Sequence, residues 1–353
     1  MHQHLRVLSI LAIVATLTSM NYCGGASSNS NISSSQSSSA SSNSNPSASS
    51  SSNSSASSNS AASGGSSVSA VNGSGSGTAG IPKVQHVAVV VLENTNYADV
   101  VGSPNAAYIN SLIVKGGLAS NYYAILHPSI GNYFALTTGE VATTDDSFTG
   151  ILTIDNVVRE LIASSKTWKS YAQSLSVPGY VGPDIYPYLR RHNPISYFSD
   201  VQLPSQQSQN LVPFSQLATD IASEQMPNYM FIVPDAQHDA HDCPGSPLAT
   251  CDIGVKVAAA DTWLSQNIAP LLANAQFQQS GILIITFDES ENDNTNGGGR
   301  VMTLLYGTGV KPGYVGTATY NHYSLLRLTM EAAGVTTIPG NGSTATDMTE
   351  FFQ

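Results

Sequence analysis

Three nearly continuous runs of apolar, largely β-branched residues lie at 83–92, 228–233 and 281–287. Because polar and apolar positions do not alternate within them, these runs are typical of parallel strands buried on both faces of a sheet. Weaker strand patterns lie at 118–125, 168–171 and 301–306. The chain therefore predicts a central, mostly parallel sheet.

Between these runs, apolar residues recur at helical spacing. Ser103 followed by Pro104 is a typical helix start, with a side-chain cap and a proline in the first turn. Helices are expected from 103 onward, at 153–164, at 214–223, at 255–275 with an interruption at Pro270, and at 322–334. Strands that alternate with helices predict an α/β fold. The length of residues 81–353 suits a single catalytic domain of this class.

Residues 178–213 show no clear period and are rich in Pro, Tyr, Ser and Gln. We expect a long excursion over the functional face of the sheet, rather than a separate domain. It carries one of the few basic clusters in the chain, around Arg191 and His192. That cluster is either a solvated loop or a cationic wall for a substrate phosphate.

The first 23 residues have a short basic start and then an apolar run, 7–20. The run is shorter than the roughly 20 residues of a membrane-spanning helix, so we interpret 1–23 as an export signal. Residues 24–80 are almost entirely Ser, Asn, Ala and Gly. Such a composition offers too few apolar side chains for a core and predicts a disordered tether.

The chain has three cysteines. Cys243 and Cys251 flank a short Pro- and Gly-containing loop, and in an exported protein they are expected to form a disulfide. Cys23 stands directly after the apolar run, where a bacterial lipoprotein carries its lipid, although Tyr22 departs from the usual small residue there. A periplasmic protein, a lipid-anchored surface protein and a secreted protein are all compatible with this pattern.

The formal net charge is −11. A nucleic-acid-binding surface is therefore not expected, because such surfaces are basic. Contact with a membrane is expected only through a lipid on Cys23. The predicted partner is a small phosphorylated substrate or a phospholipid head group.

The stretch 127–139, HPSIGNYFALTTG, joins a predicted strand to a predicted helix through a bend. Ser129 falls at the bend, where the free N–H groups of a helix start can hold an anion. A serine there can attack a phosphorus centre. A helix-capping serine is the simpler interpretation of this stretch alone.

Acidic and amide side chains follow three of the predicted strands. Glu93 and Asn94 follow the first strong run, and Asp288 and Glu289 follow the last. A cluster around Asp235 follows the middle run and ends at Cys243. Because parallel strands end at one edge of a sheet, these groups are expected to meet there. Hard oxygen ligands of this kind suit Ca²⁺, Mg²⁺ or Mn²⁺.

Five motifs together resemble the phosphoesterase family of bacterial and fungal acid phosphatases and phospholipases C, in the alkaline-phosphatase-like superfamily. They are VLENTNY, HPSIGNYFALTTG, VPDAQHDAHDC, TFDES and NHYSLLRLTMEAAG. The resemblance covers nearly all of residues 84–334. It implies a three-layer α/β/α sandwich around a mostly parallel sheet, with a serine nucleophile beside a bound metal.

Matched motif by motif, the resemblance assigns the site residues. Ser129 matches the nucleophile, and the metal ligands are Glu93, Asn94, Asp288 and Glu289. The phosphate-contacting or acid–base positions are Asn132, His238, His241 and His322. Apart from the resemblance, His127, Arg191, His192, Asp239 and Asp242 are candidates to bind substrate. One divalent ion is expected (Ca, Mg, Mn or Zn), because the Asp-x-x-x-His pair of the two-zinc relatives is missing.

The chain lacks the additional C-terminal domains of the phospholipases, which favours the short, phosphatase-like members. The sequence therefore predicts hydrolysis of phosphomonoesters through a phosphoserine. A phospholipase C-like phosphodiesterase is the alternative enzyme. A non-catalytic surface-binding protein is the alternative outside enzymes, and it would be favoured if Ser129 were buried or distant from Asp288.

Overall fold

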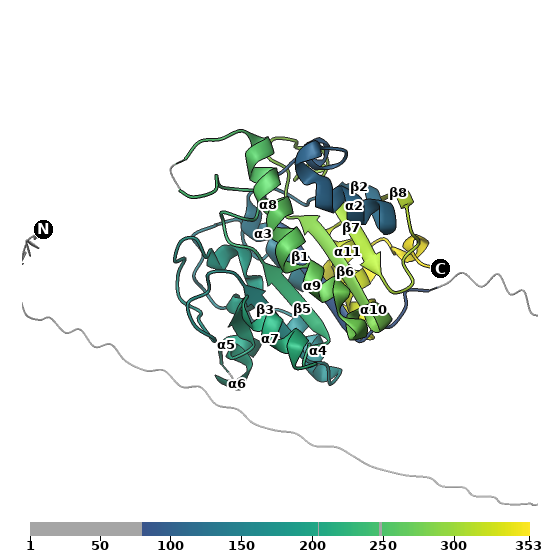
Figure 1. Cartoon of the computed structure of the whole chain (residues 1–353). Coiled ribbons are helices and arrows are strands. Elements are labelled where there is room, and N and C mark those ends of the chain that lie inside the picture. Colours follow the sequence, from purple (N-terminus) through teal and green to yellow (C-terminus); the bar gives the residue numbers. More distant parts are fainter. Residues whose placement is uncertain (1–79, 204, 247–248) are drawn as a thin grey trace, which may run out of the picture. The chain divides into compact units, whose positions relative to one another are not determined.

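The computed structural model describes residues 80–203, 205–246 and 249–353. This part of the chain contains an eight-stranded sheet with the order β4-β3-β5-β1-β6-β7-β2-β8 (Figure 1). The strands are β1 (His86–Leu92), β2 (Gly117–Tyr123), β3 (Trp168–Ala172), β4 (Leu211–Pro213), β5 (Tyr229–Val233), β6 (Gly281–Phe287), β7 (Thr303–Gly307) and β8 (Tyr314–Asn321). β7 pairs antiparallel with β6 and β2, and the other pairs are parallel.

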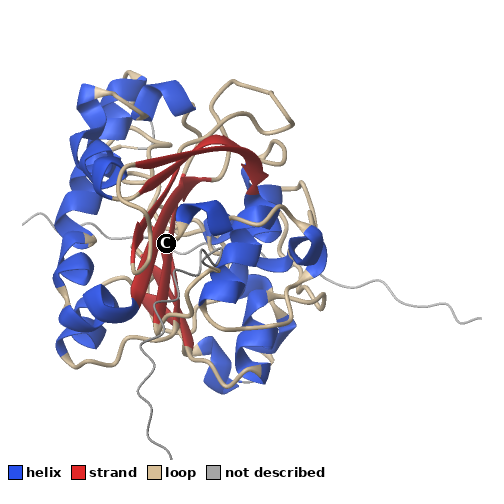
Figure 2. Cartoon of the chain, turned by 90° about the vertical axis from the view of Figure 1, so that its right-hand side faces the viewer, coloured by secondary structure: helices blue, strands red, loops and turns tan. Residues whose placement is uncertain are grey.

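Helices cover both faces of the sheet (Figure 2). The α-helices are α1 (Tyr97–Val100), α2 (Ala107–Lys115), α3 (Ser129–Thr138), α4 (Val157–Ala163), α5 (Ser199–Gln202), α6 (Ser205–Ser208), α7 (Gln216–Ala222), α8 (Ile253–Asn267), α9 (Ala269–Ala273), α10 (Ala275–Ser280) and α11 (His322–Ala332). Short 3-10 helices are η1 (Pro104–Ala106), η2 (Arg190–His192), η3 (Pro194–Tyr197), η4 (Gly340–Thr344) and η5 (Thr349–Phe351). α2 packs on α8, and α3 packs on α11. The predicted mostly parallel α/β/α arrangement is confirmed.

The register of β1 against β6 determines where the functional groups emerge. Leu92 at the end of β1 pairs with Phe287 at the end of β6. The residues that follow, Glu93 and Asp288, therefore leave the sheet at the same level. All seven residues of β6 are buried, as the apolar run predicts.

The elements that the sequence does not predict are short or lie at an edge. β4 has three residues, and the burial of β8 alternates irregularly because it is an edge strand. The predicted helix at 255–275 is broken at Ile268 into α8 and α9, with Pro270 in the first turn of α9. The excursion at 178–213 is more structured than expected, because Tyr188, Ile195 and Phe198 are buried in the core.

One side chain joins two helices on the same face of the sheet. Asp261 of α8 accepts hydrogen bonds from the backbone nitrogens of Tyr108 (3.0 Å) and Ile109 (2.8 Å) in the first turn of α2. These N–H groups have no partner within their own helix, so a carboxylate from α8 caps α2.

No helix among the described residues is long and apolar enough to cross a membrane. The predicted export signal at 1–23, the lipidation of Cys23 and nearly all of the tether at 24–80 lie outside the described residues. The domain boundary at residue 81 stays a prediction.

Candidate active site

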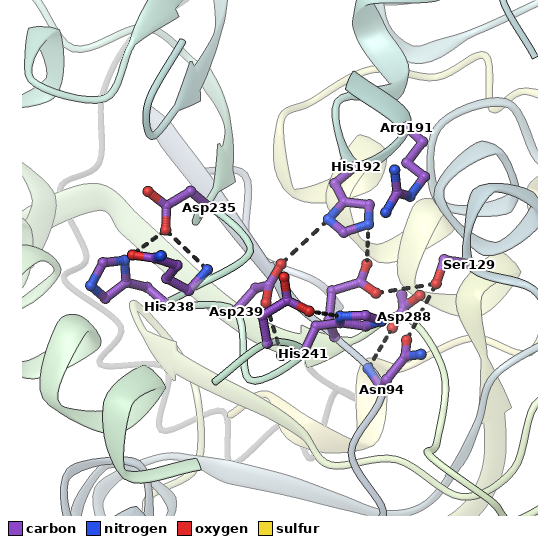
Figure 3. Close-up of polar contacts among 12 residues, drawn as sticks. Asn94, Ser129, Arg191, His192, Asp235, His238, Asp239, His241 and Asp288 are labelled. Carbon is purple, nitrogen blue, oxygen red and sulfur yellow. Dashed lines mark hydrogen bonds and ion pairs between the residues drawn. The ribbon is translucent and has the colours of Figure 1, made fainter. Parts of the chain in front are cut away.

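Ser129 is the first residue of α3, and its hydroxyl lies among acidic and amide oxygens (Figure 3). Its Oγ is 3.1 Å from Glu93 Oε2, 3.3 Å from Asn94 Oδ1 and 3.4 Å from Glu289 Oε1. Ser129 is 6 % exposed. The helix start thus holds the serine against the side chains that follow β1 and β6.

The four predicted metal ligands are brought to one place. The Asn94 backbone nitrogen donates to Asp288 Oδ1 (3.0 Å), and the Asp288 nitrogen donates to the Leu92 carbonyl oxygen (2.9 Å). Asn94 has φ of 40°, a left-handed conformation that asparagine tolerates better than most residues. This turn directs the Asn94 side chain toward Ser129 while Glu93 stays buried.

The carboxyl groups of the site have strongly perturbed proton affinities. Burial, together with repulsion from Asp288, raises the pKa of Glu93 well above its usual range. Burial raises the pKa of Asp288 to about 7, and burial plus the charge of Asp288 raises the pKa of Glu289 to about 9. Carboxyl groups crowded in a dry site hold protons unless a positive charge compensates them.

His192 and Asp239 complete the buried part of the site. The His192 ring nitrogens lie 3.3 Å from Glu93 Oε1 and 3.4 Å from Asp239 Oδ2. Burial lowers the pKa of His192 and raises the pKa of Asp239 to about 7. His192 was predicted to bind substrate from a basic loop. The structure instead places it inside the cluster of acids, stacked on Tyr133 with ring centroids 5.2 Å apart.

The donor set fits a hard divalent cation. Among the described residues, three buried carboxylate oxygens make no hydrogen bond, namely Glu93 Oε1, Asp239 Oδ2 and Asp288 Oδ2. Buried carboxylate oxygens without a hydrogen bond are costly, and a cation supplies the missing charge. Two of them, Glu93 Oε1 and Asp239 Oδ2, also face the ring nitrogens of His192. As these side chains stand, no group of three His, Cys, Asp or Glu residues in the described ranges is arranged to hold an ion. The argument for a metal therefore rests on the type of these oxygen atoms and not on a preformed coordination geometry.

Two predicted residues on the stretch 127–139 lie next to Glu289. His127 Nδ1 is 3.0 Å from Glu289 Oε2, and its Nε2 is 3.2 Å from the Asp293 carbonyl oxygen. Asn132 Nδ2 is 3.3 Å from Glu289 Oε2 and 2.8 Å from the Leu126 carbonyl oxygen. Asn132 was expected to contact phosphate. Its amide instead donates hydrogen bonds to Leu126 and Glu289, so it positions these groups.

His241 lies at the side of the buried acids. Its Nδ1 is 2.6 Å from Asp242 Oδ1, and its backbone nitrogen donates to Asp239 Oδ1 (2.9 Å). Asp242, predicted to bind substrate, therefore fixes the orientation of His241. Cys243 follows directly and forms a disulfide with Cys251, which closes the loop behind this pair.

The other two predicted histidines do not reach the serine. His322 is fully buried, with Nδ1 2.8 Å from the Tyr122 hydroxyl and Nε2 2.6 Å from the Asp288 carbonyl oxygen. Burial lowers its pKa to about 4, so it is neutral. Since both ring nitrogens are used, His322 holds the Asp288 backbone and has no nitrogen left for phosphate.

His238 is bonded to Asp235 Oδ1 through Nδ1 at 2.6 Å. In Figure 3 it lies on the opposite side of Asp239 from Ser129. The hydrogen bond to Asp235 raises the pKa of His238. The expected acid–base role of His238 does not fit this position, because its Nδ1 contacts Asp235 and Gln173, the residue that follows β3.

Arg191, predicted to form a cationic wall, lies at the rim beside His192 (Figure 3). Its Nη1 is paired with Asp184 Oδ2. A phosphate would therefore compete with Asp184 for this guanidinium group. Arg191 remains a candidate substrate contact at the edge of the site.

Two residues near the serine were not singled out from the sequence. Tyr133 lies one helical turn after Ser129, and its hydroxyl is near Glu93; that spacing was a usable signal. Asp146 Oδ1 accepts a hydrogen bond from the Ile130 nitrogen (3.2 Å). Asp146 lies in an aperiodic loop, and no pattern in the sequence points to it.

A mostly parallel α/β sheet places a serine at a helix start among carboxyl groups at the strand ends, the arrangement expected from the sequence. The fold is similar to that of the lipoteichoic acid synthase LtaP from Listeria monocytogenes. The TM-score is 0.54 with 14 % sequence identity, covering 77 % of each chain.

The sequence comparisons give the family. Residues 103–336 match the model of the phosphoesterase family, and the chain belongs to that family. It is 30 % identical over 254 residues to phosphatidylinositol-3-phosphatase of Mycobacterium tuberculosis, covering 71 % of this chain and 78 % of the relative. It is 29 % identical to acid phosphatase of Aspergillus fumigatus, covering 67 % of this chain but only 52 % of the relative. The predicted family is thus confirmed.

Proposed function

We propose that the protein hydrolyses phosphomonoesters through a phosphoserine formed on Ser129. The position of Ser129 Oγ, within 3.4 Å of Glu93, Asn94 and Glu289 at the start of α3, carries the proposal. The names of the relatives support monoesters over diesters, because they are phosphatases. Ser129 is buried, which is one of the two conditions that favour a non-catalytic binding protein, whereas the acids around its hydroxyl favour the enzyme.

In the first step, the Ser129 hydroxyl donates a hydrogen bond to Glu93 Oε2, 3.1 Å away, which orients it, and its proton passes to solvent water. Ser129 Oγ then forms a bond to phosphorus as the bond from phosphorus to the alcohol oxygen breaks.

The departing alcohol needs a proton, and His241 is the proposed donor. The carboxylate of Asp242 orients its imidazole through Nδ1. In the second step, water attacks the phosphoserine, and His241, having given up its proton to the alcohol, accepts the proton of that water. Inorganic phosphate leaves, and the serine oxygen takes up a proton from solvent water.

A divalent cation is part of the proposal. Glu93, Asn94, Asp288 and Glu289 would hold it, with Asp239 as a further carboxylate nearby. When bound, such an ion favours the serine alkoxide and polarises the phosphoryl oxygens. Its identity among Ca, Mg, Mn and Zn is left to metal analysis of the purified protein.

We also propose that the protein acts outside the cytoplasm. The disulfide between Cys243 and Cys251 supports this location, because such bonds persist in oxidising compartments. The apolar run at 7–20 supports it independently. Small phosphorylated compounds are the proposed substrates, with a lipid on Cys23 as the proposed membrane anchor.

Replacing the nucleophile tests the proposed function. Ser129→Ala is expected to lower kcat with p-nitrophenyl phosphate by about a thousandfold or more, because the covalent route is lost. Ser111→Ala, on the exposed side of α2, is the matched control and should leave kcat unchanged. Acid quenching with a labelled substrate should trap phosphate on the wild type only.

A Ser129→Ala protein that keeps a tenth of the wild-type rate would contradict the assignment. Parallel assays with p-nitrophenyl phosphate and p-nitrophenylphosphorylcholine distinguish the monoesterase from the phospholipase C-like alternative. A clear preference for the second substrate would overturn the monoester proposal while keeping the nucleophile.

A further inference from the structure

A buried tyrosine hydroxyl is linked to the predicted metal ligand Asp288 through one histidine. Tyr122 belongs to β2 and is fully buried. Its hydroxyl oxygen is 2.8 Å from Nδ1 of His322, the first residue of α11. His322 Nε2 is 2.6 Å from the Asp288 carbonyl oxygen. Hydrogen bonds thus connect β2 through α11 to the residue that follows β6, and the proposed reaction makes no use of Tyr122.

The carbonyl oxygen at one end of this connection determines which atoms carry the hydrogens. A carbonyl oxygen can only accept a hydrogen bond, so Nε2 of His322 must be the protonated ring nitrogen. The ring is buried between a hydroxyl and a carbonyl group, neither of which is charged, so the imidazole is neutral and Nδ1 carries a lone pair. The hydroxyl of Tyr122 must therefore donate to Nδ1.

Tyr122 thereby favours one of the two neutral forms of His322. If the ring hydrogen were on Nδ1, the lone pair of Nε2 would face the lone pairs of the Asp288 carbonyl oxygen, and this hydrogen bond would be lost. A hydroxyl that donates to Nδ1 stabilises the form with the hydrogen on Nε2. The contact of His322 with Asp288 therefore depends on the oxygen atom of Tyr122.

Asp288 is fixed by three hydrogen bonds, of which the bond from His322 is one. The Asp288 nitrogen donates to the Leu92 carbonyl oxygen (2.9 Å), and its Oδ1 accepts from the Asn94 nitrogen (3.0 Å). Its Oδ2 is buried and makes no hydrogen bond. Loss of the bond from His322 would loosen the backbone of the residue whose Oδ2 is left for a cation.

We infer that Tyr122 is a positioning residue for the cation site: its hydroxyl keeps the ring hydrogen of His322 on Nε2, and His322 in turn holds Asp288 for the ion. This inference rests on the proposed function, because Asp288 is one of the residues that would hold the cation. Removing a group that orients a metal ligand typically weakens metal binding by about 10–100-fold. Tyr122 acts through a second residue, so we expect an effect near the lower limit.

Cation affinity tests the inference without any assay of activity. Calorimetric titration of the chelator-stripped protein with Mg²⁺, Ca²⁺, Mn²⁺ and Zn²⁺ identifies the ion that the wild type binds most tightly, and the variants are titrated with that ion. Tyr122→Phe, which removes only the hydroxyl, should raise the Kd by about tenfold. Tyr171→Phe is the matched control, because it removes an equally buried hydroxyl of the same sheet, 2.6 Å from Asp220 Oδ2. It should leave the Kd unchanged at a temperature where both variants are folded.

The position of the ring hydrogen is a second readout, which a purely structural role would not change. Nitrogen NMR of the wild type should show His322 protonated on Nε2 and not on Nδ1, and Tyr122→Phe should populate the other form. His322→Gln assigns the signal by removing it. A glutamine amide both donates and accepts without this choice of form, so Tyr122→Phe added to His322→Gln should change the Kd by less than about twofold.

Four outcomes overturn the inference. They are an unchanged Kd in folded Tyr122→Phe, an equal increase of the Kd in Tyr171→Phe, a protonated Nδ1 of His322 in the wild type, and absence of binding by all four ions. Failure of the proposed function would appear separately, as hydrolysis of p-nitrophenyl phosphate by Ser129→Ala, and would leave the difference in Kd between the two tyrosine variants in place.

Discussion

Asn132, on the helix that begins with Ser129, uses its side-chain amide to bond other parts of the protein. Its Oδ1 accepts hydrogen bonds from the nitrogens of Ile125 (3.0 Å) and Leu126 (3.3 Å). Its Nδ2 donates to the Leu126 carbonyl oxygen and to Glu289. The turn that leads into α3 and the carboxylate beside Ser129 are therefore held by one side chain.

Asn132→Ala is expected to lower the free energy of unfolding by about 2 kcal/mol, because several buried polar groups lose their partner. It should also lower kcat more than it changes KM, since Glu289 loses an anchor. Urea denaturation and steady-state kinetics measure the two effects. Asn121→Ala, which removes one exposed hydrogen bond to Thr317, serves as the control. Equal losses of stability in both variants would show that Asn132 has no special role.

At the residue scale, sequence reasoning succeeded where a strand end determines the position. Glu93, Asn94, Asp288 and Glu289 follow long apolar runs, and strand register brings them together with Ser129. Sequence reasoning failed where the contacts of a residue depend on the direction in which its side chain points. His322 also follows a strand, yet it turns inward to Tyr122 because a buried ring needs partners for both nitrogens.

The same contrast holds for whole elements. β1, β5 and β6 were predicted because central strands are apolar throughout. The sequence did not predict β4, β8 and α10. A three-residue strand, an edge strand and a six-residue helix carry too few buried positions to show a periodic pattern of apolar residues. Their existence depends on neighbours that are distant in the sequence.

The cap between α8 and α2 is a further feature that no local pattern reveals. Asp261→Ala should lower the free energy of unfolding by about 1–3 kcal/mol, because the Tyr108 and Ile109 N–H groups lose a charged acceptor. Since α2 and α8 contribute no side chain to the serine site, kcat/KM should stay within twofold at temperatures where the variant is folded.

Thermal unfolding measured alongside activity tests this, with Thr262→Ala as the control on the next, exposed position of α8. A loss of activity in folded Asp261→Ala would show that this face of the sheet is coupled to the site. A stability equal to that of Thr262→Ala would show that the cap contributes little.

For the molecule as a whole, the buried acids make stability depend on pH and on cations. Burial raises the pKa values of Asp239 and Asp288 to about 7 and that of Glu289 to about 9. Below about pH 4 these groups are protonated in both the folded and the unfolded chain. As pH rises above that value, the unfolded chain releases protons first, so the metal-free protein loses stability up to about pH 9.

A divalent cation that holds these carboxyl groups ionised should cancel this loss. The gain in Tm on adding Mg²⁺, Ca²⁺, Mn²⁺ or Zn²⁺ to protein stripped with a chelator should therefore increase from pH 5 to pH 8. Scanning fluorimetry across this range measures it. A gain that is independent of pH for every one of these ions would exclude the four predicted ligands as the binding site.

The segment between β3 and β4 supplies Asp184, Arg190 and Tyr197 to a cavity that Asp146 also lines, whereas the groups proposed to react follow β1, β5 and β6 or start α3. The wall of this cavity and the groups around Ser129 thus lie largely in different stretches of one chain. Substitutions in 178–213 can change the wall while the strand ends stay as they are. His192 is an exception within that segment, because its ring lies 3.3 Å from Glu93 Oε1.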